Sequence, residues 1–321
     1  TMTEDLTRRS RLRVFACVAA MVGMVVGGPR AEAQDPAWNP HPGSGDVVVP
    51  MPGSFKMVFV KVPVPGKGTF GGPERIFELG GDKLSPSPFQ YPRQVRIGPT
   101  FRQTNGEGFL VFGKYEVTIG QYAALAGNGD IAKGLQKLAD ISNIEQLKRD
   151  GARPEELAND KRFLSRALHA ISVADYHDFI ASYNDWCLTS EAGKACAEVM
   201  RKELGSVGFF RLPFEPEWEY VARGGAASAR SGAALPFPAG EIESYAHVAS
   251  KRQQPDEIGK FKPLPMLPVY DIFGNVSELM GGSYELVIDK GYPVLVNDPE
   301  ANDWMRQVTS DLLGPTAVVG S

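Results

Sequence analysis

Cysteine and histidine are scarce in this sequence, which limits the metal and nucleophile chemistry that it can carry. The 321 residues include three cysteines and four histidines. They contain no Cys-x-x-Cys or His-x-x-x-His pair, no Gly-rich phosphate loop, and no Ser, His and Asp in a recognisable catalytic order. The sequence therefore gives little support for a three-histidine iron centre, a nucleotide-phosphate loop or a hydrolase triad.

The chain also lacks an excess of positive charge. It has 34 Lys and Arg residues against 38 Asp and Glu residues, for a formal net charge of −4. No basic cluster follows the first 33 residues, so neither nucleic acid nor an anionic membrane surface is an expected partner. A protein or peptide partner remains compatible with this composition.

The first residues have the pattern of an export signal. Four arginines lie between positions 8 and 13, an apolar run covers 14–26, and Ala31 and Ala33 are small residues of the type that signal peptidase recognises. We predict a signal peptide over 1–33, a mature protein that begins near Gln34, and a periplasmic or secreted location. Twin-arginine export and ordinary secretion both stay open.

The apolar run of the signal also bears on membrane anchoring. It is too short for a comfortable membrane span, and Gly27, Gly28 and Pro29 interrupt the chain directly after it. We therefore expect no transmembrane span after signal removal. A retained anchor is the alternative.

Glycine and proline are abundant, with 35 and 25 residues in the chain, and they favour short elements joined by loops. Residues 34–52 read as an extended N-terminal segment that precedes a single domain over 53–321. Strand composition appears at 57–62, 94–101 and 108–117. The sequence thus predicts an irregular, loop-rich α+β fold.

One stretch inside this domain has a helical pattern instead. Ile131, Leu135 and Leu138 recur at helical spacing within 127–168, and Gly151 and Pro154 break the pattern into shorter helices. A lid over a substrate or partner and a decoration packed on the side of the domain are the two interpretations. Nothing in the stretch offers chemistry, which favours the second.

Two motifs in the second half of the chain carry most of the information. The first is Arg-Leu-Pro-Phe-Glu-Pro-Glu-Trp-Glu-Tyr-Val-Ala-Arg-Gly-Gly over 211–225, and the second is Tyr-Asp-Ile-Phe-Gly-Asn-Val-Ser-Glu over 270–278. In the first motif, acidic residues and Pro216 open a helix over 215–223, and two glycines end it.

Together the two motifs resemble the formylglycine-generating enzyme, or sulfatase-modifying factor, family. Two earlier blocks extend the resemblance in the order that the family uses. These are Lys-Tyr-Glu-Val-Thr-Ile-Gly-Gln-Tyr over 114–122 and Ile-Ser-Val-Ala-Asp-Tyr-His-Asp-Phe over 171–179. The resemblance covers roughly 91–278. It implies the family's irregular α+β fold, which is related to C-type lectin folds.

The second motif also has the chemistry of a calcium site. Asp271 and Glu278 flank a Gly-Asn turn, and carboxylates with loop carbonyls are the ligands that Ca²⁺ takes. The resemblance implies four ligands, namely the side chains of Asp271 and Glu278 and the carbonyls of Gly274 and Val276. A turn with two solvated carboxylates is the alternative. A second calcium site of the family would begin at His247 and lacks its acidic loop here, so we expect it to be absent.

The catalytic part of the resemblance fails. The family's enzymes carry two cysteines in a late Arg-Gly-Gly-Ser block, and their thiolates bind copper(I). This sequence has no cysteine after Cys196, and Gly-Gly-Ser-Tyr at 281–284 resembles the block only faintly. Copper is therefore not supported, and no catalytic residue can be assigned. We expect that the C-terminal catalytic block is missing from this chain.

Two function hypotheses follow from that expectation. In the first, the chain is an enzyme-family member whose redox block is missing. In the second, it is a non-catalytic extracytoplasmic module that binds a peptide, a glycan or a protein partner. A paired-cysteine block in the full gene would favour the enzyme.

Two cysteines remain after the predicted signal, Cys187 and Cys196. Along one unbroken helix they would lie about 13 Å apart, so a disulfide between them requires a turn near 189–193. Export to an oxidising compartment favours this disulfide. Two free thiols are the alternative.

Overall fold

The computed structural model describes most of the chain between residues 38 and 295. The described ranges are 38–68, 71–80, 93–149, 151–226, 235–247 and 254–281, with the backbone alone of 285–287 and 293–295. The chain divides into two compact units, 1–33 and 34–321, and all described residues belong to the second. The predicted signal peptide lies outside the described residues, as does the end of the predicted domain after 295.

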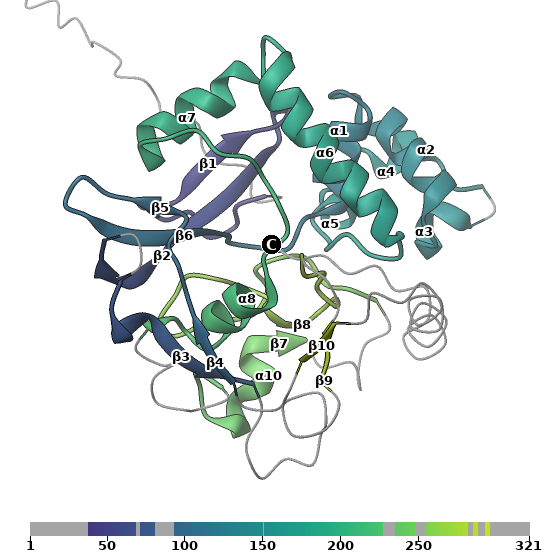
Figure 1. The fold of residues 1–321 in the computed structure, drawn as a ribbon. Helices are drawn as coiled ribbons and strands as arrows, with labels where there is room; N and C mark the ends of the chain where they lie inside the picture. Colours follow the sequence, from purple (N-terminus) through teal and green to yellow (C-terminus); the bar gives the residue numbers. More distant parts are fainter. Residues whose placement is uncertain are drawn as a thin grey trace, which may run out of the picture. The chain divides into compact units, whose positions relative to one another are not determined.

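A central antiparallel sheet is the framework of the second unit (Figure 1). Its strands in spatial order are β1 (Val47–Pro50), β2 (Lys56–Lys67), β6 (Glu107–Gly113) and β5 (Phe101–Arg102). Successive side chains of a strand point to opposite faces, so Phe59 packs in one hydrophobic cluster and Val60 in another. Phe109 and Leu110 of β6 divide between the same two clusters. The sheet therefore lies between two cores.

The N-terminal segment predicted over 34–52 contributes a strand to this sheet. β1 pairs antiparallel with β2, with Val47 opposite Phe59. Val47 and Val49 are buried, and Trp38 packs against the Phe55 ring at 5.1 Å between ring centroids. The domain boundary predicted at residue 53 thus falls inside the packed core. The alternating valines determine the local structure more strongly than the surrounding prolines and glycines.

Helices pack on both faces of the sheet. All of the α-helices of the described residues lie between β6 and the second motif. They are α1 (Ile119–Ala126), α2 (Ile131–Ile141), α3 (Glu145–Lys148), α4 (Pro154–Leu157), α5 (Lys161–Leu164), α6 (Val173–Thr189), α7 (Lys194–Leu204), α8 (Glu215–Ala222) and α10 (Ile242–Tyr245), with 3-10 turns η1 (Pro52–Ser54), η2 (Pro73–Arg75) and η3 (Ala239–Glu241). In the described ranges, no helix combines the length and apolar composition that a membrane span requires.

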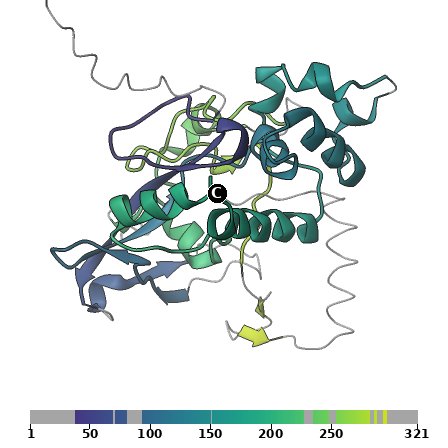
Figure 2. The same cartoon turned by 90° about the horizontal axis from the view of Figure 1, so that it is seen from above.

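The first five helices gather beside one another in both views (Figures 1 and 2). Helices α2 to α5 lie within 127–168, where the sequence predicts a helical insertion. α1 begins at Ile119 because Thr118 caps it: its hydroxyl accepts from the Gln121 N–H, and the Gln121 side chain accepts from the Thr118 N–H. The cap holds the backbone at Thr118, two residues after Glu116.

Three two-stranded pairings complete the described secondary structure. They are β3 (Ile76–Leu79) with β4 (Arg93–Arg96), antiparallel, β7 (Ala246–His247) with β8 (Phe273–Gly274), parallel, and β9 (Glu285–Val287) with β10 (Pro293–Leu295), antiparallel. The β7 and β8 pair brings the second motif against a segment 27 residues earlier in the chain.

Cys187 and Cys196 are bonded to each other, with their Cα atoms 5.6 Å apart. Helix α6 ends at Thr189 and α7 begins at Lys194, so a turn separates the two cysteines. Gly193 makes the turn possible, because a Cβ there would lie 2.0 Å from the Trp186 carbonyl oxygen. The disulfide holds α7 against the end of α6.

Candidate metal centre

The second motif forms a tight loop with unusual backbone angles. Asp271 and Asn275 have positive φ angles of 58° and 59°, in the left-handed region that Asp and Asn enter more readily than most residues. Gly274 has a φ of 82°, and a Cβ on it would lie 2.2 Å from the His247 carbonyl oxygen. The loop therefore requires glycine at 274 and tolerates short polar residues at its two other left-handed positions.

Asn275 connects this loop to three other segments. Its amide nitrogen donates to Oε2 of Glu116 at 2.5 Å. Its side-chain oxygen accepts from the Asp256 N–H at 2.7 Å and lies 3.3 Å from Nδ1 of His247. This amide therefore contacts residues that lie 19, 28 and 159 positions from Asn275 in the sequence.

Three carboxylates meet around the loop. Asp271 is 2% exposed, and its Oδ2 accepts from the Gly259 N–H at 2.6 Å. Its Oδ1 is buried and has no hydrogen-bond partner. Glu278 accepts from the indole N–H of Trp218 on α8, and Glu116 accepts from Asn275 and from the Val276 N–H.

The electrostatics of this cluster disfavour three negative charges. Burial raises the pKa of Asp271 from 3.8 to about 7; the Gly259 hydrogen bond opposes this rise, and the charge of Asp256 adds to it. Burial, and next the charges of Asp271 and Glu278, raise the pKa of Glu116 well above its ordinary value. In Glu278 burial again raises the pKa most, the Trp218 hydrogen bond opposes the rise, and Asp271 adds to it.

No basic side chain compensates these carboxylates in the part of the chain that the structure describes. Lys114 is the nearest lysine in sequence to Glu116, and it forms a buried ion pair with Asp46 at 2.8 Å instead. The carbonyl of His41 accepts a further hydrogen bond from the same ammonium group. A buried carboxylate without a cation is costly, so the cluster is electrostatically incomplete as protein alone.

These residues fit a hard divalent cation. Among the described residues, no group of three or more His, Cys, Asp and Glu side chains is arranged to hold a metal ion. The predicted set needs only two such side chains, because two backbone carbonyls complete it. Oδ1 of Asp271 supplies an anionic oxygen that the protein leaves without a donor, which is the donor type that Ca²⁺ takes. Asp271 and Glu278 would hold the ion with the carbonyls of Gly274 and Val276.

The alternative of a turn with two solvated carboxylates describes this loop poorly, because Asp271 is buried. Glu116 is the residue that the sequence analysis missed. It lies in the Tyr-Glu-Val-Thr block that carries part of the family resemblance, and that block was the available signal.

At the position where a second calcium site was expected to be absent, a histidine lies beside an acidic side chain. His247 is buried, and its Nδ1 lies 3.3 Å from Oδ2 of Asp256. Asp256 also pairs with Lys260 at 2.5 Å. Asp256 therefore contacts both His247 and Lys260.

The charged residues of the first motif stabilise α8. Arg211 forms a bidentate ion pair with Glu217 at 2.7 and 2.8 Å, and Glu217 also accepts from the Phe214 N–H at the start of the helix. Arg223 at the end of α8 pairs with Glu219 at 2.5 Å. α8 in turn places Trp218 on Glu278, which is how the first motif supports the second.

One comparison with known proteins agrees with these motifs. A family model described as the sulfatase-modifying factor enzyme 1-like domain matches residues 71–302. A comparison with curated proteins finds no match. Among solved structures, variable protein 1 of Treponema denticola is similar, with 18% sequence identity and a TM-score of 0.44 over 79% of this chain and 80% of that one. Because the family model covers well over half of its length, the chain belongs to the sulfatase-modifying factor enzyme 1-like family, also called the formylglycine-generating enzyme family.

Proposed function

We propose that this protein is an exported formylglycine-generating-enzyme-like domain that binds Ca²⁺ in the 271–278 loop as a structural ion. The observation that carries the proposal is Oδ1 of Asp271, a buried carboxylate oxygen with no hydrogen-bond partner. A divalent cation would give this oxygen a partner and would offset the charge of Glu278. We propose further that its α+β fold is of the kind related to C-type lectin folds, as the family resemblance implies.

A structural role for the ion follows from what surrounds it. Asp271 and Glu278 belong to the loop, Glu278 contacts Trp218 on α8, and Glu116 contacts the loop through Asn275. A bound cation would hold these segments together. We therefore propose that the ion stabilises the fold.

We also propose that this chain does not oxidise cysteine to formylglycine. The family's reaction depends on a pair of thiolates that bind copper(I), a soft metal that prefers sulfur ligands. In the printed sequence the cysteines after the predicted signal are Cys187 and Cys196, and in the structure they are bonded to each other. A disulfide cannot supply these thiolates.

The proposed location is the periplasm or the extracellular space. The charge and hydropathy pattern of residues 1–33 supports export, and a disulfide is the form that two cysteines take in an oxidising compartment. Ca²⁺ in the millimolar range is sufficient for the weak loop sites that extracellular modules use.

Calcium titration tests the central proposal. We expect the melting temperature of the purified protein to rise with Ca²⁺ and to fall after treatment with EGTA. A ligand present at 100 times its Kd stabilises the folded state by about 2.7 kcal/mol. Calorimetric titration should give binding of one Ca²⁺ per chain. A protein whose melting is indifferent to both Ca²⁺ and EGTA would refute the site.

A further inference from the structure

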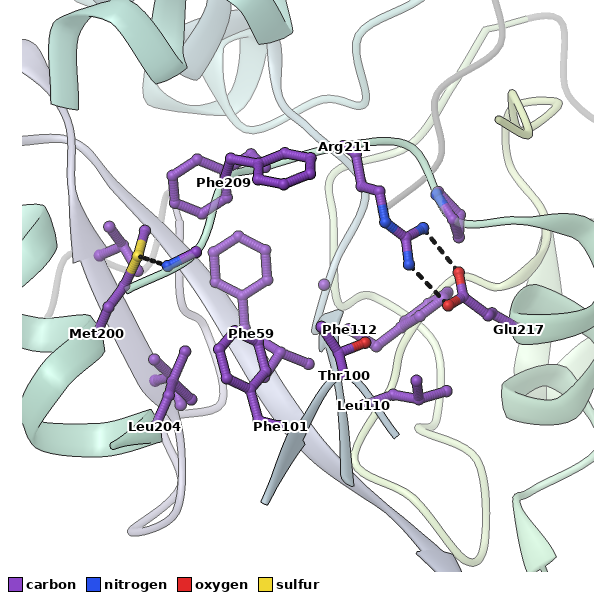
Figure 3. Close-up of a pocket in the computed structure, with 17 residues that line it drawn as sticks. Phe59, Thr100, Phe101, Leu110, Phe112, Met200, Leu204, Phe209, Arg211 and Glu217 are labelled. Atoms are coloured by element: carbon purple, nitrogen blue, oxygen red, sulfur yellow. Dashed lines mark hydrogen bonds and ion pairs between the residues drawn. The ribbon is translucent and has the colours of Figure 1, made fainter. Parts of the chain in front are cut away.

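A pocket lies on one face of the central sheet, and none of the residues proposed to bind calcium lines it (Figure 3). Its lining comes from β1, β2, β6, the chain around β5, the end of α7, and the loop 205–214. Its volume is about 100 Å³. Apolar residues form most of its wall, among them Val47, Val49, Phe59, Phe101, Met200 and Leu204.

The pocket has one polar side. Figure 3 shows Arg211 across the pocket from Met200, with Thr100 below it. The guanidinium group of Arg211 donates to both oxygens of Glu217 and to the Leu212 carbonyl. Arginine has five N–H donors, and in the described part of the chain three of them are engaged. The remaining two are available to a hydrogen-bond acceptor at this side.

Exposed apolar side chains are frequent in the loop that lines the pocket. Phe209 lines the pocket and is 75% exposed, while Val207 and Phe214 in the same loop are 41% and 47% exposed. Three of the eight large exposed hydrophobic residues of the described chain therefore fall within 207–214. Apolar surface concentrated in this way at the edge of a pocket marks a binding site more often than scattered single residues do.

Size and chemistry together define the ligand. An enclosed apolar cavity of about 150 Å³ accommodates benzene. This pocket is smaller but open, so it has room for one ring or one branched aliphatic group. Arg211 lines the same pocket, so a ligand with a carbonyl or another hydrogen-bond acceptor next to its apolar group would fit best.

We propose that the pocket binds a single aromatic or branched aliphatic group that carries a hydrogen-bond acceptor. A hydrophobic residue of a peptide has this chemistry in its side chain and its backbone carbonyl, and so does a free N-acylated hydrophobic amino acid. The group enters past Phe209, packs between Phe59 and Met200, and places its acceptor at Arg211. This proposal is independent of calcium binding.

Gly208 offers a position from which a larger side chain can fill the pocket. It lines the pocket, and its N–H donates to Sδ of Met200 at 3.4 Å. A Cβ on Gly208 would lie 3.0 Å from Cζ of Phe101, the far end of a side chain that lines the same pocket. A leucine at this position should therefore fill the space that the ligand takes. Gly240 in η3 is a matched control, because a Cβ there meets nothing within 4 Å.

The test is NMR of the full chain with methionine methyl groups labelled by ¹³C. The Met200 signal is identified by its loss in Met200→Leu. N-acetyl-phenylalanine amide is titrated first, and N-acetyl-alanine amide serves as the ligand without a ring. We expect the phenylalanine compound to shift the Met200 signal and to bind about tenfold or more tightly than the alanine compound, because burial of a phenyl ring contributes that much.

The variants decide where the ligand binds. Gly208→Leu should weaken binding of the phenylalanine compound about tenfold or more, since it occupies the pocket, and Gly240→Leu should leave binding unchanged. Circular dichroism melting of both variants confirms that each is folded. Equal affinity for the two compounds, or equal affinity in the two variants, would overturn the proposal.

Two further ligands test the role of Arg211 and the source of the ligand separately. Toluene has the ring and no acceptor, so toluene that binds as tightly as N-acetyl-phenylalanine amide would overturn the assigned role of Arg211. A blocked Ala-Phe-Ala tripeptide distinguishes the source of the ligand. Tighter binding of the tripeptide supports a peptide, and tighter binding of the single amino acid supports a small molecule.

Discussion

Replacement of Asp271 by asparagine should stabilise the calcium-free protein at neutral and alkaline pH. The variant keeps the shape of the side chain, and its amide oxygen can still accept from the Gly259 N–H. Asparagine also tolerates the left-handed φ of 58° at this position. The substitution removes the buried charge, and it places an amide NH2 group where Oδ1 has no hydrogen-bond partner. Its effect on stability therefore reports the cost of the charge less the smaller cost of an unpaired donor.

The pKa of Asp271 gives the size of the effect. A rise from 3.8 to about 7 on folding corresponds to about 4 kcal/mol. Between these two pH values the folded state binds more protons than the unfolded state, so the stability of the wild-type protein falls as the pH rises through this window. Above pH 7 the loss is complete. Asparagine has no such loss, so the variant should exceed the wild type by up to about 4 kcal/mol at pH 8 and by little below pH 4.

Urea unfolding in EGTA at pH 8 and at pH 3.5 measures this difference. Asp140→Asn, at an exposed position on α2, is the matched control and should change the free energy of unfolding by less than about 0.5 kcal/mol. In the second part of the experiment, saturating Ca²⁺ should stabilise the wild type and leave Asp271→Asn unchanged. A variant that is less stable than the wild type at pH 8 in EGTA, or that still responds to Ca²⁺, would refute the reasoning.

Four other predictions concern the loop, the cysteines and export. Gly274→Ala should destabilise the protein by more than about 1 kcal/mol in urea unfolding, because the new Cβ meets a carbonyl oxygen at 2.2 Å, whereas Gly240→Ala should have little effect. Loss of the disulfide in Cys187→Ser or Cys196→Ser should cost about 3 kcal/mol, as expected for so short a loop. Neither the wild type nor these variants should form aldehyde on a Cys-x-Pro-x-Arg peptide with copper(I) and oxygen, as mass spectrometry would show; turnover that either substitution abolishes would make the cysteines catalytic. Exported protein should begin near Gln34, and recovery of exported protein that retains residues 1–33 would contradict the predicted signal.

Local signals in the sequence predicted several elements closely. The helix expected over 215–223 is α8, which ends one residue earlier because Arg223 is its C-cap. The strand expected over 94–101 divides into β4 and β5, which pair with different partners on either side of Pro99. Proline has no N–H to donate to a ladder, so the break has a local cause that a composition-based strand prediction overlooks.

The contacts that assemble the candidate site could not be predicted in the same way. Glu116 and Asn275 are 159 residues apart, and neither position has a local signal that names the other. The charges of Lys114 and Glu116 are also misleading, because two opposite charges so close in sequence suggest a pair. In the structure Lys114 pairs with Asp46, and Glu116 accepts a hydrogen bond from Asn275. Side-chain pairing of this kind depends on how the sheet and helices pack, which no single-sequence pattern specifies.

Because these contacts are long-range, the candidate calcium site can exist only in the folded domain. Asp271 is held by Gly259, Glu278 by Trp218, and the loop by the contact between Asn275 and Glu116. An unfolded chain has none of these constraints, so the free energy of calcium binding becomes free energy of folding. The ion should therefore stabilise the second unit as a whole. Calcium should slow hydrogen exchange in β6, beside Glu116, and in α8, beside Glu278, as well as in the loop itself. Protection confined to 271–278 would mean that the loop binds the ion without the contacts described here.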